Sequence, residues 1–221
     1  MSKNQQSGNP KSKVEIHGFE ARHYDGLMNS ITFGAYKKFI RSSIAAMKIN
    51  PNDKILDLGA GTGRNACLMN KYLSDEGGIV GLDISDEMMK QFEKKCSSFP
   101  NVKVVNQRID EPLPFENEFD KAFSSFVIHG FPQEKREIII QNIWKALKPG
   151  GSFYMLDYNE FNLEEKPWLS RKIFKTFECP YAFDFIEKDW ESIFSRLKFN
   201  QFESKFYFRG YIRLFRARKQ I

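Results

Sequence analysis

The hydrophobic positions of this chain follow two patterns that alternate along the sequence. Short apolar runs predict strands buried in a parallel sheet at 54–58, 79–83, 102–106, 119–125 and 152–157. Apolar residues at helical spacing predict helices at 17–29, 33–48, 63–73, 85–97 and 133–147. Alternation over 199–217 predicts two more strands that turn near Gly210. We therefore expect an α/β fold: a doubly wound seven-stranded sheet with helices on both faces, in which strands six and seven form a terminal hairpin.

The two ends of the chain differ from its body. Residues 1–13 are polar and carry three lysines without an acid, which predicts a disordered arm. The remaining residues, 14–221, suffice for one domain with a substantial core, since 41% of the chain is hydrophobic. Every apolar run is shorter than the ~20 residues of a membrane span, and the N-terminus is not signal-like. We therefore expect a cytoplasmic protein.

The positive charge is concentrated at the C-terminal end. The net charge is +6, and residues 205–221 carry six basic residues and no acid. We expect an exposed strand face in this segment. The alternative is a patch that binds RNA, because basic residues interleaved with aromatic ones also suit nucleic acid.

Cysteine and histidine spacing gives no sign of a metal site. Cys67, Cys96 and Cys179 form no C-x-x-C pair, and we expect them to be reduced packing residues. His17 and His23 lie close together but lack a third ligand at metal spacing.

The most informative motif is K-I-L-D-L-G-A-G-T-G at 54–63, where an apolar strand runs into a glycine-spaced turn and then a helix. Gly59, Gly61 and Gly63 remove Cβ atoms where a ligand must approach the backbone. Asp83 ends the next apolar run, and its carboxylate can accept hydrogen bonds from both hydroxyls of a ribose. These features predict a nucleotide-type site.

The glycine pattern argues against two nucleotide classes. The dinucleotide fingerprint G-x-G-x-x-G requires glycine where this chain has Arg64, which weakens an NAD site. No G-x-x-x-x-G-K-[ST] run occurs, so a P-loop is excluded. A G-x-G-x-G loop preceded by Asp57 better suits a ligand with an adenosine end and a compact zwitterionic tail.

Four motifs in register resemble the class I S-adenosylmethionine-dependent methyltransferases. Beside the glycine loop they are G-L-D-I-S-D-E-M-M (81–89), L-P-F-E-N-E-F-D (113–120) and L-K-P-G-G (147–151). The chain is most similar to the ubiquinone/menaquinone C-methyltransferases and their small-molecule relatives (methyltransferase type 11 group), whose first helix resembles H-Y-D-G-L-M-N-S-I-T-F-G (23–34). The resemblance covers about three-fifths of the chain. It implies a Rossmann-like fold that binds S-adenosylmethionine.

The resemblance assigns cofactor contacts residue by residue. Asp83 matches the acid that binds the ribose. Ile84 would lie against the adenine, and Met88 one helical turn further on could pack nearby. The other residues assigned to the cofactor are Asp57, Gly59, Ala60, Gly61, Gly63, Ile109, Asp110 and Ser124.

The adenine edge departs from the family pattern. Relatives have an aspartate where this chain has Ile109. Two arrangements remain open: Asp110 reaches the exocyclic amine after a one-residue slip, or the backbone of Ile109 and Asp110 serves alone.

Methyl transfer from a sulfonium is a direct displacement, so alignment of the reacting atoms and exclusion of water matter most. A base is needed only when the acceptor must lose a proton. His129, after the fourth strand, is the candidate base; its alternative role is to orient its loop. The quinone-type relatives tend to carry arginine at this position. Tyr24 matches a lid tyrosine over the methionine end, and its alternative role is to staple two helices.

Substrate recognition is expected in two segments, lid helices at 14–50 and a substrate cap insertion at 158–190. The cap is rich in aromatic residues that could roof a pocket for a flat or lipid-like acceptor. We therefore expect methyl transfer to a small aromatic or lipid-like acceptor. The alternatives are an RNA or protein methyltransferase, and a catalytically silent S-adenosylmethionine-binding partner protein.

Overall fold

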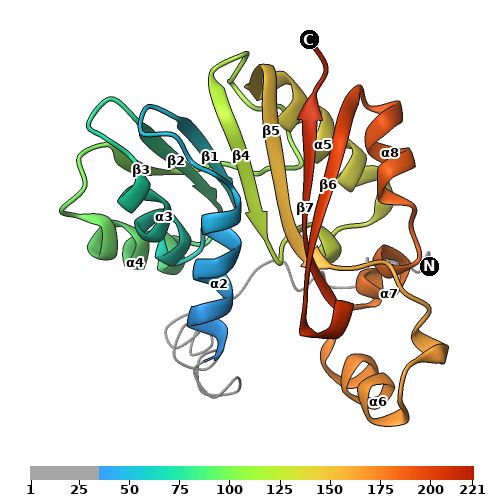
Figure 1. Cartoon of the computed structure of the whole chain (residues 1–221). Helices are drawn as coiled ribbons and strands as arrows, with labels where there is room; N and C mark the ends of the chain where they lie inside the picture. The colour runs from blue at the N-terminus through green and yellow to red at the C-terminus, as the bar shows by residue number, and fades with distance from the viewer. Residues whose placement is uncertain (1–34) are drawn as a thin grey trace, which may run out of the picture.

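The computed structural model describes residues 35–221, whose elements are labelled in Figure 1. The strands are β1 (Lys54–Leu58), β2 (Gly78–Asp83), β3 (Val102–Asn106), β4 (Phe119–Ser125), β5 (Leu147–Tyr158), β6 (Phe199–Tyr207) and β7 (Ile212–Lys219). The α-helices are α2 (Ala35–Ala46), α3 (Arg64–Met69), α4 (Asp86–Cys96), α5 (Gln133–Ala146), α6 (Trp168–Phe177), α7 (Pro180–Ile186) and α8 (Trp190–Arg196). The short 3-10 turns are η1 (Asn70–Tyr72), η2 (Ile128–Gly130), η3 (Leu163–Glu165) and η4 (Phe208–Gly210). The helix expected at 17–29 lies outside the described residues.

The seven strands form one sheet in the order β3-β2-β1-β4-β5-β7-β6. Strands β1 to β5 pair in parallel, whereas β7 is antiparallel to both β5 and β6. The predicted doubly wound sheet with a terminal hairpin is therefore confirmed. The chain order reverses between β1 and β4, which is where sheets of this class open a crevice for ligands at the carboxyl ends of their strands.

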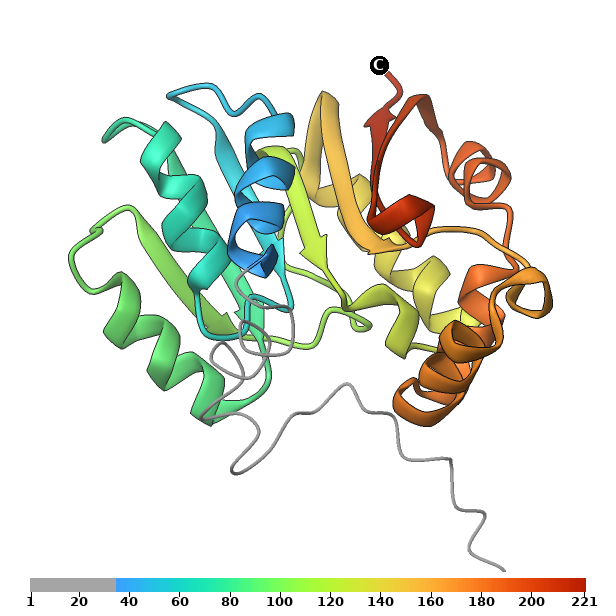
Figure 2. The same cartoon turned by 60° about the horizontal axis from the view of Figure 1, so that its bottom comes forward.

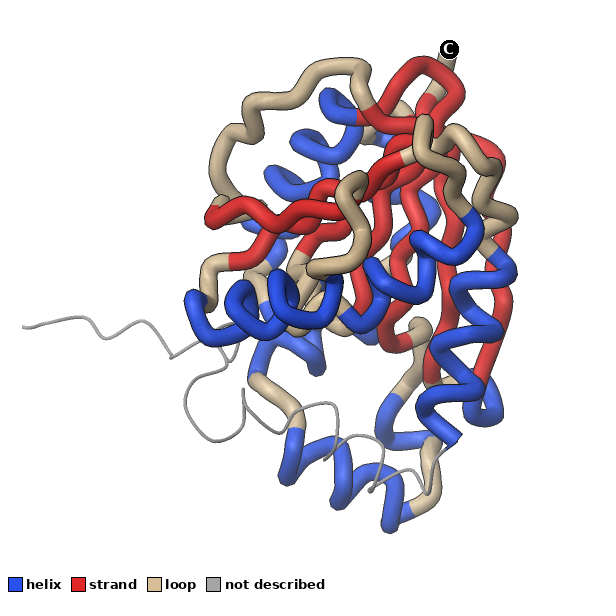
Figure 3. The backbone as a smooth tube through the Cα atoms, turned by 90° about the vertical axis from the view of Figure 1, so that its left-hand side faces the viewer, coloured by secondary structure: helices blue, strands red, loops and turns tan. Residues whose placement is uncertain are grey.

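Each face of the sheet has its own hydrophobic core, because successive strand side chains point to opposite faces. Leu56 of β1 belongs to the core that includes residues of α5 and α8. Its neighbour Ile55 belongs to the core that includes residues of α2 and α3. Figure 2 and Figure 3 show helices on both sides of the sheet.

Strand β5 is longer than its apolar run predicts. It begins at Leu147, directly after α5, and Leu147 pairs with Phe119 of β4. The Pro-Gly-Gly sequence at 149–151 therefore lies within the strand. Proline and glycine weaken the sequence signal for a strand, which explains why the pattern predicts a later start.

The basic C-terminal strand is interior, which corrects the expected exposed face. Because β7 pairs with β5 on one side and β6 on the other, Arg213 and Lys219 are each only 4% exposed. Arg213 binds Glu160 at 2.7 Å, and Lys219 donates to the Leu147 carbonyl at 2.7 Å. Much of the basic segment therefore serves to hold the sheet together.

Two of the three cysteines are paired, which contradicts the expectation of reduced thiols. Cys67 of α3 and Cys96 of α4 form a disulfide, with their Cα atoms 6.0 Å apart. Cys179 is free and buried. Sequence spacing does not show the pairing, because it depends on α3 packing beside α4.

Membrane-spanning segments were searched for among residues 35–221. None of the helices there is both long and apolar enough to cross a bilayer.

Candidate active site

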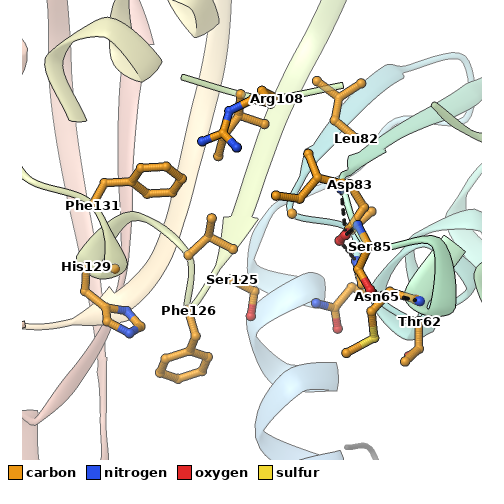
Figure 4. Close-up of a pocket in the computed structure, with 18 of the residues that line it drawn as sticks. Thr62, Asn65, Leu82, Asp83, Ser85, Arg108, Ser125, Phe126, His129 and Phe131 are labelled. Carbon is orange, nitrogen blue, oxygen red and sulfur yellow. Dashed lines mark hydrogen bonds between the residues drawn. The ribbon is translucent and has the colours of Figure 1, made fainter. Parts of the chain in front are cut away.

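A cavity of about 190 Å³ opens at the carboxyl ends of β1, β2 and β4. Figure 4 shows its two walls, with Asp83, Ser85 and Asn65 on one side and His129 and Phe126 on the other. The lining residues come from the segments 59–65, 82–88, 107–110, 125–131 and 178–179 and from Tyr36. The cavity thus lies at the point where the sheet topology predicts a ligand site.

The cavity brings together most of the site residues predicted from the sequence. Those that line it are Gly59, Ala60, Gly61, Asp83, Ile84, Met88, Ile109, Asp110 and His129. Three others do not: Asp57 and Ser124 are buried within strands, and Gly63 precedes α3. Ser125, one residue after Ser124, takes the lining position. Tyr24 lies outside the described residues, and Tyr36 is the lining residue from the described part of the lid segment.

Asp83 organises the donor side of the cavity through its carboxylate. Oδ2 accepts a hydrogen bond from the Gly61 backbone N–H at 2.7 Å. Oδ1 accepts from the N–H groups of Ile84 and Ser85 at 2.8 and 2.9 Å. A carboxylate has about four lone-pair sites, so Asp83 can also accept from a ligand hydroxyl. The predicted ribose acid therefore also fixes the loops that surround it.

The three glycines of the loop have different roles. All have positive φ, +67° at Gly59, +55° at Gly61 and +75° at Gly63. A Cβ on Gly61 would meet no atom closer than 4.0 Å, which leaves space for a ligand. A Cβ on Gly59 would collide with Val127, and one on Gly63 would collide with Phe92 of α4. The expectation that all three make room for a ligand is therefore corrected: Gly63 permits helix packing.

Asp57 is a buried acid behind this loop. Its side chain is 1% exposed, and Oδ2 has no hydrogen-bond partner among the described residues. Burial, followed by the charge of Asp83, raises the pKa of Asp57 to about 8. A positive charge at the adjacent cavity would relieve this cost. The methionine end of S-adenosylmethionine carries such charges, so the site fits this cofactor.

At the adenine edge, the carboxylate of Asp110 is held by two basic side chains. Arg108 Nε lies 3.0 Å from Oδ1, and Lys135 Nζ lies 3.2 Å from Oδ2. Burial opposes ionisation of Asp110, but these hydrogen bonds hold its pKa below the ordinary value. The carbonyl of Ile109 accepts from Asn142 at 3.0 Å. Both predicted arrangements for the adenine remain predictions.

On the wall of the cavity opposite Asp83, here called the acceptor side, the imidazole of His129 lies between two carboxylates, Asp157 and Glu178. His129 Nδ1 lies 2.7 Å from Oδ1 of Asp157, a residue at the end of β5. The backbone N–H of His129 donates to Asp157 Oδ2 at 3.3 Å. Asp157 is fully buried, and Oδ1 also accepts from the Tyr158 N–H at 2.9 Å. On the cavity side, His129 Nε2 lies 3.8 Å from Glu178 Oε2. Sequence reasoning assigned no role to Asp157 or Glu178.

The charge state of His129 follows from these neighbours. Burial alone would lower the pKa of the imidazole, and Arg136 acts in the same direction. Asp157, through its charge and its hydrogen bond, and Glu178 outweigh both, so the pKa of His129 is raised above its ordinary value of 6.5. With Asp157 accepting from Nδ1, Nε2 is the nitrogen left to exchange a proton with a ligand.

A fully buried arginine fastens the His129 turn to the cap. Arg136 of α5 donates to the His129 carbonyl at 3.2 Å and to the Tyr181 carbonyl at 2.6 Å. It also forms an ion pair with Asp184 of α7 at 2.7 Å. The position of η2 is thus tied to α7 through one guanidinium group.

The cap differs from the predicted aromatic roof. Its aromatic rings pack on one another, as where Phe174 contacts Tyr158, Phe161 and Phe183. Among described residues of 158–190, only Glu178 and Cys179 line the cavity. Aromatic content alone did not reveal which side chains face inward.

No group of three or more histidine, cysteine or acidic side chains within residues 35–221 could hold a metal ion.

Comparisons with known proteins agree with this geometry. Residues 55–151 match the family model of a methyltransferase domain. The chain is 31% identical over 140 residues to a ubiquinone/menaquinone biosynthesis C-methyltransferase of Wigglesworthia glossinidia brevipalpis, covering 62% of this chain and 55% of the relative. It is 30% identical over 156 residues to a demethylmenaquinone methyltransferase of Staphylococcus carnosus, covering 69% and 64%. The matches thus span a little over half to just under two thirds of these relatives.

The fold also matches solved structures. An S-adenosylmethionine-dependent methyltransferase from Aquifex aeolicus superposes with a TM-score of 0.58 at 18% identity, covering 76% of this chain and 83% of that one. The sheet order, the glycine loop with Asp83 and the domain match lead to one conclusion. They support a class I S-adenosylmethionine-dependent methyltransferase.

Proposed function

We propose that this chain transfers a methyl group from S-adenosylmethionine to a small aromatic or lipid-like acceptor that gives up a hydroxyl proton. The observation that carries the proposal is the His129–Asp157 pair, whose imidazole lines the cavity on the side opposite Asp83 (Figure 4). A cofactor loop and a buried acid–base pair thus share one cavity.

The cofactor supplies a methyl group on a positively charged sulfur. In the proposed arrangement, Asp83 accepts from the ribose hydroxyls, and the open space above Gly61 admits the ligand. Ile84, in the loop before α4, and Met88, in the first turn of α4, provide apolar contacts for the adenine. The ionised form of Asp57 would favour the positively charged methionine end, and that end would in turn favour ionisation of Asp57.

The affinity for S-adenosylmethionine is expected to rise with pH towards about pH 8. Asp57 is mostly protonated below its pKa of about 8, whereas a positively charged ligand favours the ionised form. Binding then releases a proton, and the affinity rises by up to about tenfold per pH unit below this pKa. Calorimetric titrations across this range measure the slope.

The matched control is Asp57→Asn, which keeps the shape of the side chain and removes its titration. This variant is expected to show a flatter pH dependence. An equal slope in both proteins would show that Asp57 is not the linked group.

On the acceptor side, His129 is placed to act as a general base. Asp157 accepts from Nδ1, so it selects the tautomer and holds the ring, and Nε2 takes the acceptor's proton. Phe126, Val127 and Phe131 supply apolar surface beside the imidazole. Such surface suits a ring or an alkyl group and limits the access of water.

The proposed acceptor class is supported by this surface and by the names of the relatives. The two curated relatives are a C-methyltransferase of ubiquinone/menaquinone biosynthesis and a demethylmenaquinone methyltransferase. We propose an acceptor of the same general kind, a hydroxylated aromatic ring that is lipid-like. We also propose that 14–50 and 158–190 form the lid and the cap over it, within one domain.

The test is transfer of labelled methyl groups from S-adenosylmethionine into a cell extract, followed by separation into lipid, small-molecule, RNA and protein fractions. Label is expected in the lipid or small-molecule fraction, and Asp83→Ala protein should reduce it. Label in RNA or protein would support the alternative methyltransferase classes. Cofactor binding without transfer to any fraction would support a silent binding partner.

A further inference from the structure

Glu178 approaches the reactive nitrogen of His129 from the cap. It lies between α6 and α7, and its side chain is 20% exposed where it lines the cavity. Oε1 accepts a hydrogen bond from the Tyr158 hydroxyl. This bond orients the carboxylate and leaves Oε2 facing His129 Nε2 at 3.8 Å.

The distance of 3.8 Å is too long for a hydrogen bond, for which N–H···O distances run to about 3.2 Å. Because Asp157 accepts from Nδ1, Nε2 of the neutral imidazole is itself an acceptor. Two acceptor atoms therefore face each other without a hydrogen between them. Once Nε2 takes a proton, it becomes a donor, and Glu178 becomes its charge partner.

We propose that Glu178 is a positioning residue that stabilises the protonated imidazole of His129 from the cavity side, opposite Asp157. This inference rests on the proposed function. In the step, the acceptor's O–H bond would break, an N–H bond would form at Nε2, and the electron pair would stay on the acceptor. The acceptor would then take the methyl group as the methyl–sulfur bond of the sulfonium breaks, its electron pair staying on sulfur and a neutral thioether leaving. Asp157 and Glu178 then flank the imidazolium, so the efficiency of the base depends on the cap segment that carries Glu178.

The proposal also restricts the acceptor. The carboxylate of Glu178 places negative charge beside the point where the acceptor's hydroxyl must lie. An acceptor that is already an anion at its reacting end would be repelled by it. The site therefore favours a neutral hydroxyl that is deprotonated only in place.

Other charged or titratable groups also face His129. Asp157 and Tyr158 lie on β5, Arg136 on α5, and the Cys179 sulfur lies 4.0 Å from the His129 carbonyl. Arg136 is paired with Asp184, and its contacts to the His129 turn are through backbone carbonyls. Glu178 is the group among these that is both acidic and on the cavity side of the ring.

The experiment follows the imidazole by NMR in the full chain. The sequence has three histidines, so His129→Gln assigns the His129 signal by its loss. In Glu178→Gln, the midpoint of the His129 titration is expected to fall by roughly half a pH unit or more, because a nearby negative charge is removed. The amide keeps an oxygen for the Tyr158 hydroxyl, so the variant preserves the local shape.

The matched control is Glu164→Gln, an exposed acid of the same cap segment that pairs with Arg171 and Lys175. It is expected to leave the His129 midpoint unchanged. An unchanged midpoint in Glu178→Gln, or an equal fall in both variants, would overturn the proposal. If Glu178→Gln fails to fold, Glu178→Asp withdraws the carboxylate by one methylene and should also lower the midpoint.

A second readout uses turnover. Once the extract assay has identified an acceptor, Glu178→Gln is expected to lower kcat by about 10-fold with little change in the KM for S-adenosylmethionine. A change confined to this KM would contradict the role of Glu178 as a positioning residue. The titration needs no acceptor, so its failure is distinguishable from a failure of methyl transfer itself.

Discussion

Replacing Asp83 by alanine is expected to weaken S-adenosylmethionine binding by about 100-fold or more. Hydrogen bonds to a charged group are worth roughly 1.5–3 kcal/mol each, and every 1.4 kcal/mol is a factor of about ten. The variant loses the two proposed ribose bonds. It also releases the backbone N–H groups of Gly61, Ile84 and Ser85. Isothermal calorimetry measures the effect.

Two further variants distinguish the loss of the ribose hydrogen bonds from a disturbance of the loops that Asp83 holds. Asp83→Asn keeps one acceptor oxygen and removes the charge, so an intermediate affinity is expected. Asp86→Ala, which removes an exposed acid in the first turn of the following helix, α4, is expected to bind normally. Unchanged affinity in Asp83→Ala would refute the ribose assignment. A thermal melt of each protein shows whether the fold is retained.

The second large effect is expected for His129→Ala, which should reduce turnover by about 10²–10⁴-fold, the usual contribution of a general base. Binding of S-adenosylmethionine should change little, because the imidazole lies on the acceptor side of the cavity (Figure 4). Asp157→Asn should also lower turnover, since it disturbs the tautomer that exposes Nε2. Equal turnover in His129→Ala and the parent would leave His129 with only a structural role.

The same residue sets the expected pH dependence. Burial lowers the pKa of His129, but Asp157 and Glu178 raise it above the ordinary value of 6.5. Because a base works in its neutral form, kcat should rise with pH through a midpoint above 6.5. The contribution of protonated His129 to the stability of the fold changes in the opposite direction. It is complete at pH values below the ordinary pKa of histidine and is lost as the pH rises through the raised pKa of His129 in the folded protein. Activity and this part of the stability should therefore change in opposite directions across that window.

Local features of the sequence singled out Gly59, Gly61 and Asp83, which the structure brings together at the cavity. The apolar run before Gly59 and the acid at Asp83 fix a strand, a turn and a carboxylate within short stretches of chain. Their placement follows from the rule that parallel strands end at the same edge of a sheet. Asp83 accordingly lies where its sequence position indicated, and its bond to Gly61 spans only neighbouring loops.

The acceptor half depends on contacts that no local pattern contains. Asp157 reaches His129 because β5 pairs beside β4, and Glu178 reaches it because Arg136 ties the start of α7 to the His129 turn. The interior position of β7 has the same cause: an alternating pattern indicates a strand but not how many neighbours it has. Periodicity also could not tell that Gly63 packs against Phe92 of α4.

Arg136 ties one helix of the cap, α7, to the His129 turn. Its buried guanidinium joins the His129 turn to the backbone at Tyr181 and to Asp184, so α7 cannot shift without moving the base. Helix α6 shares none of these bonds and rests on the core through Phe174. A substitution that shifts α7 is therefore expected to displace the His129 turn with it.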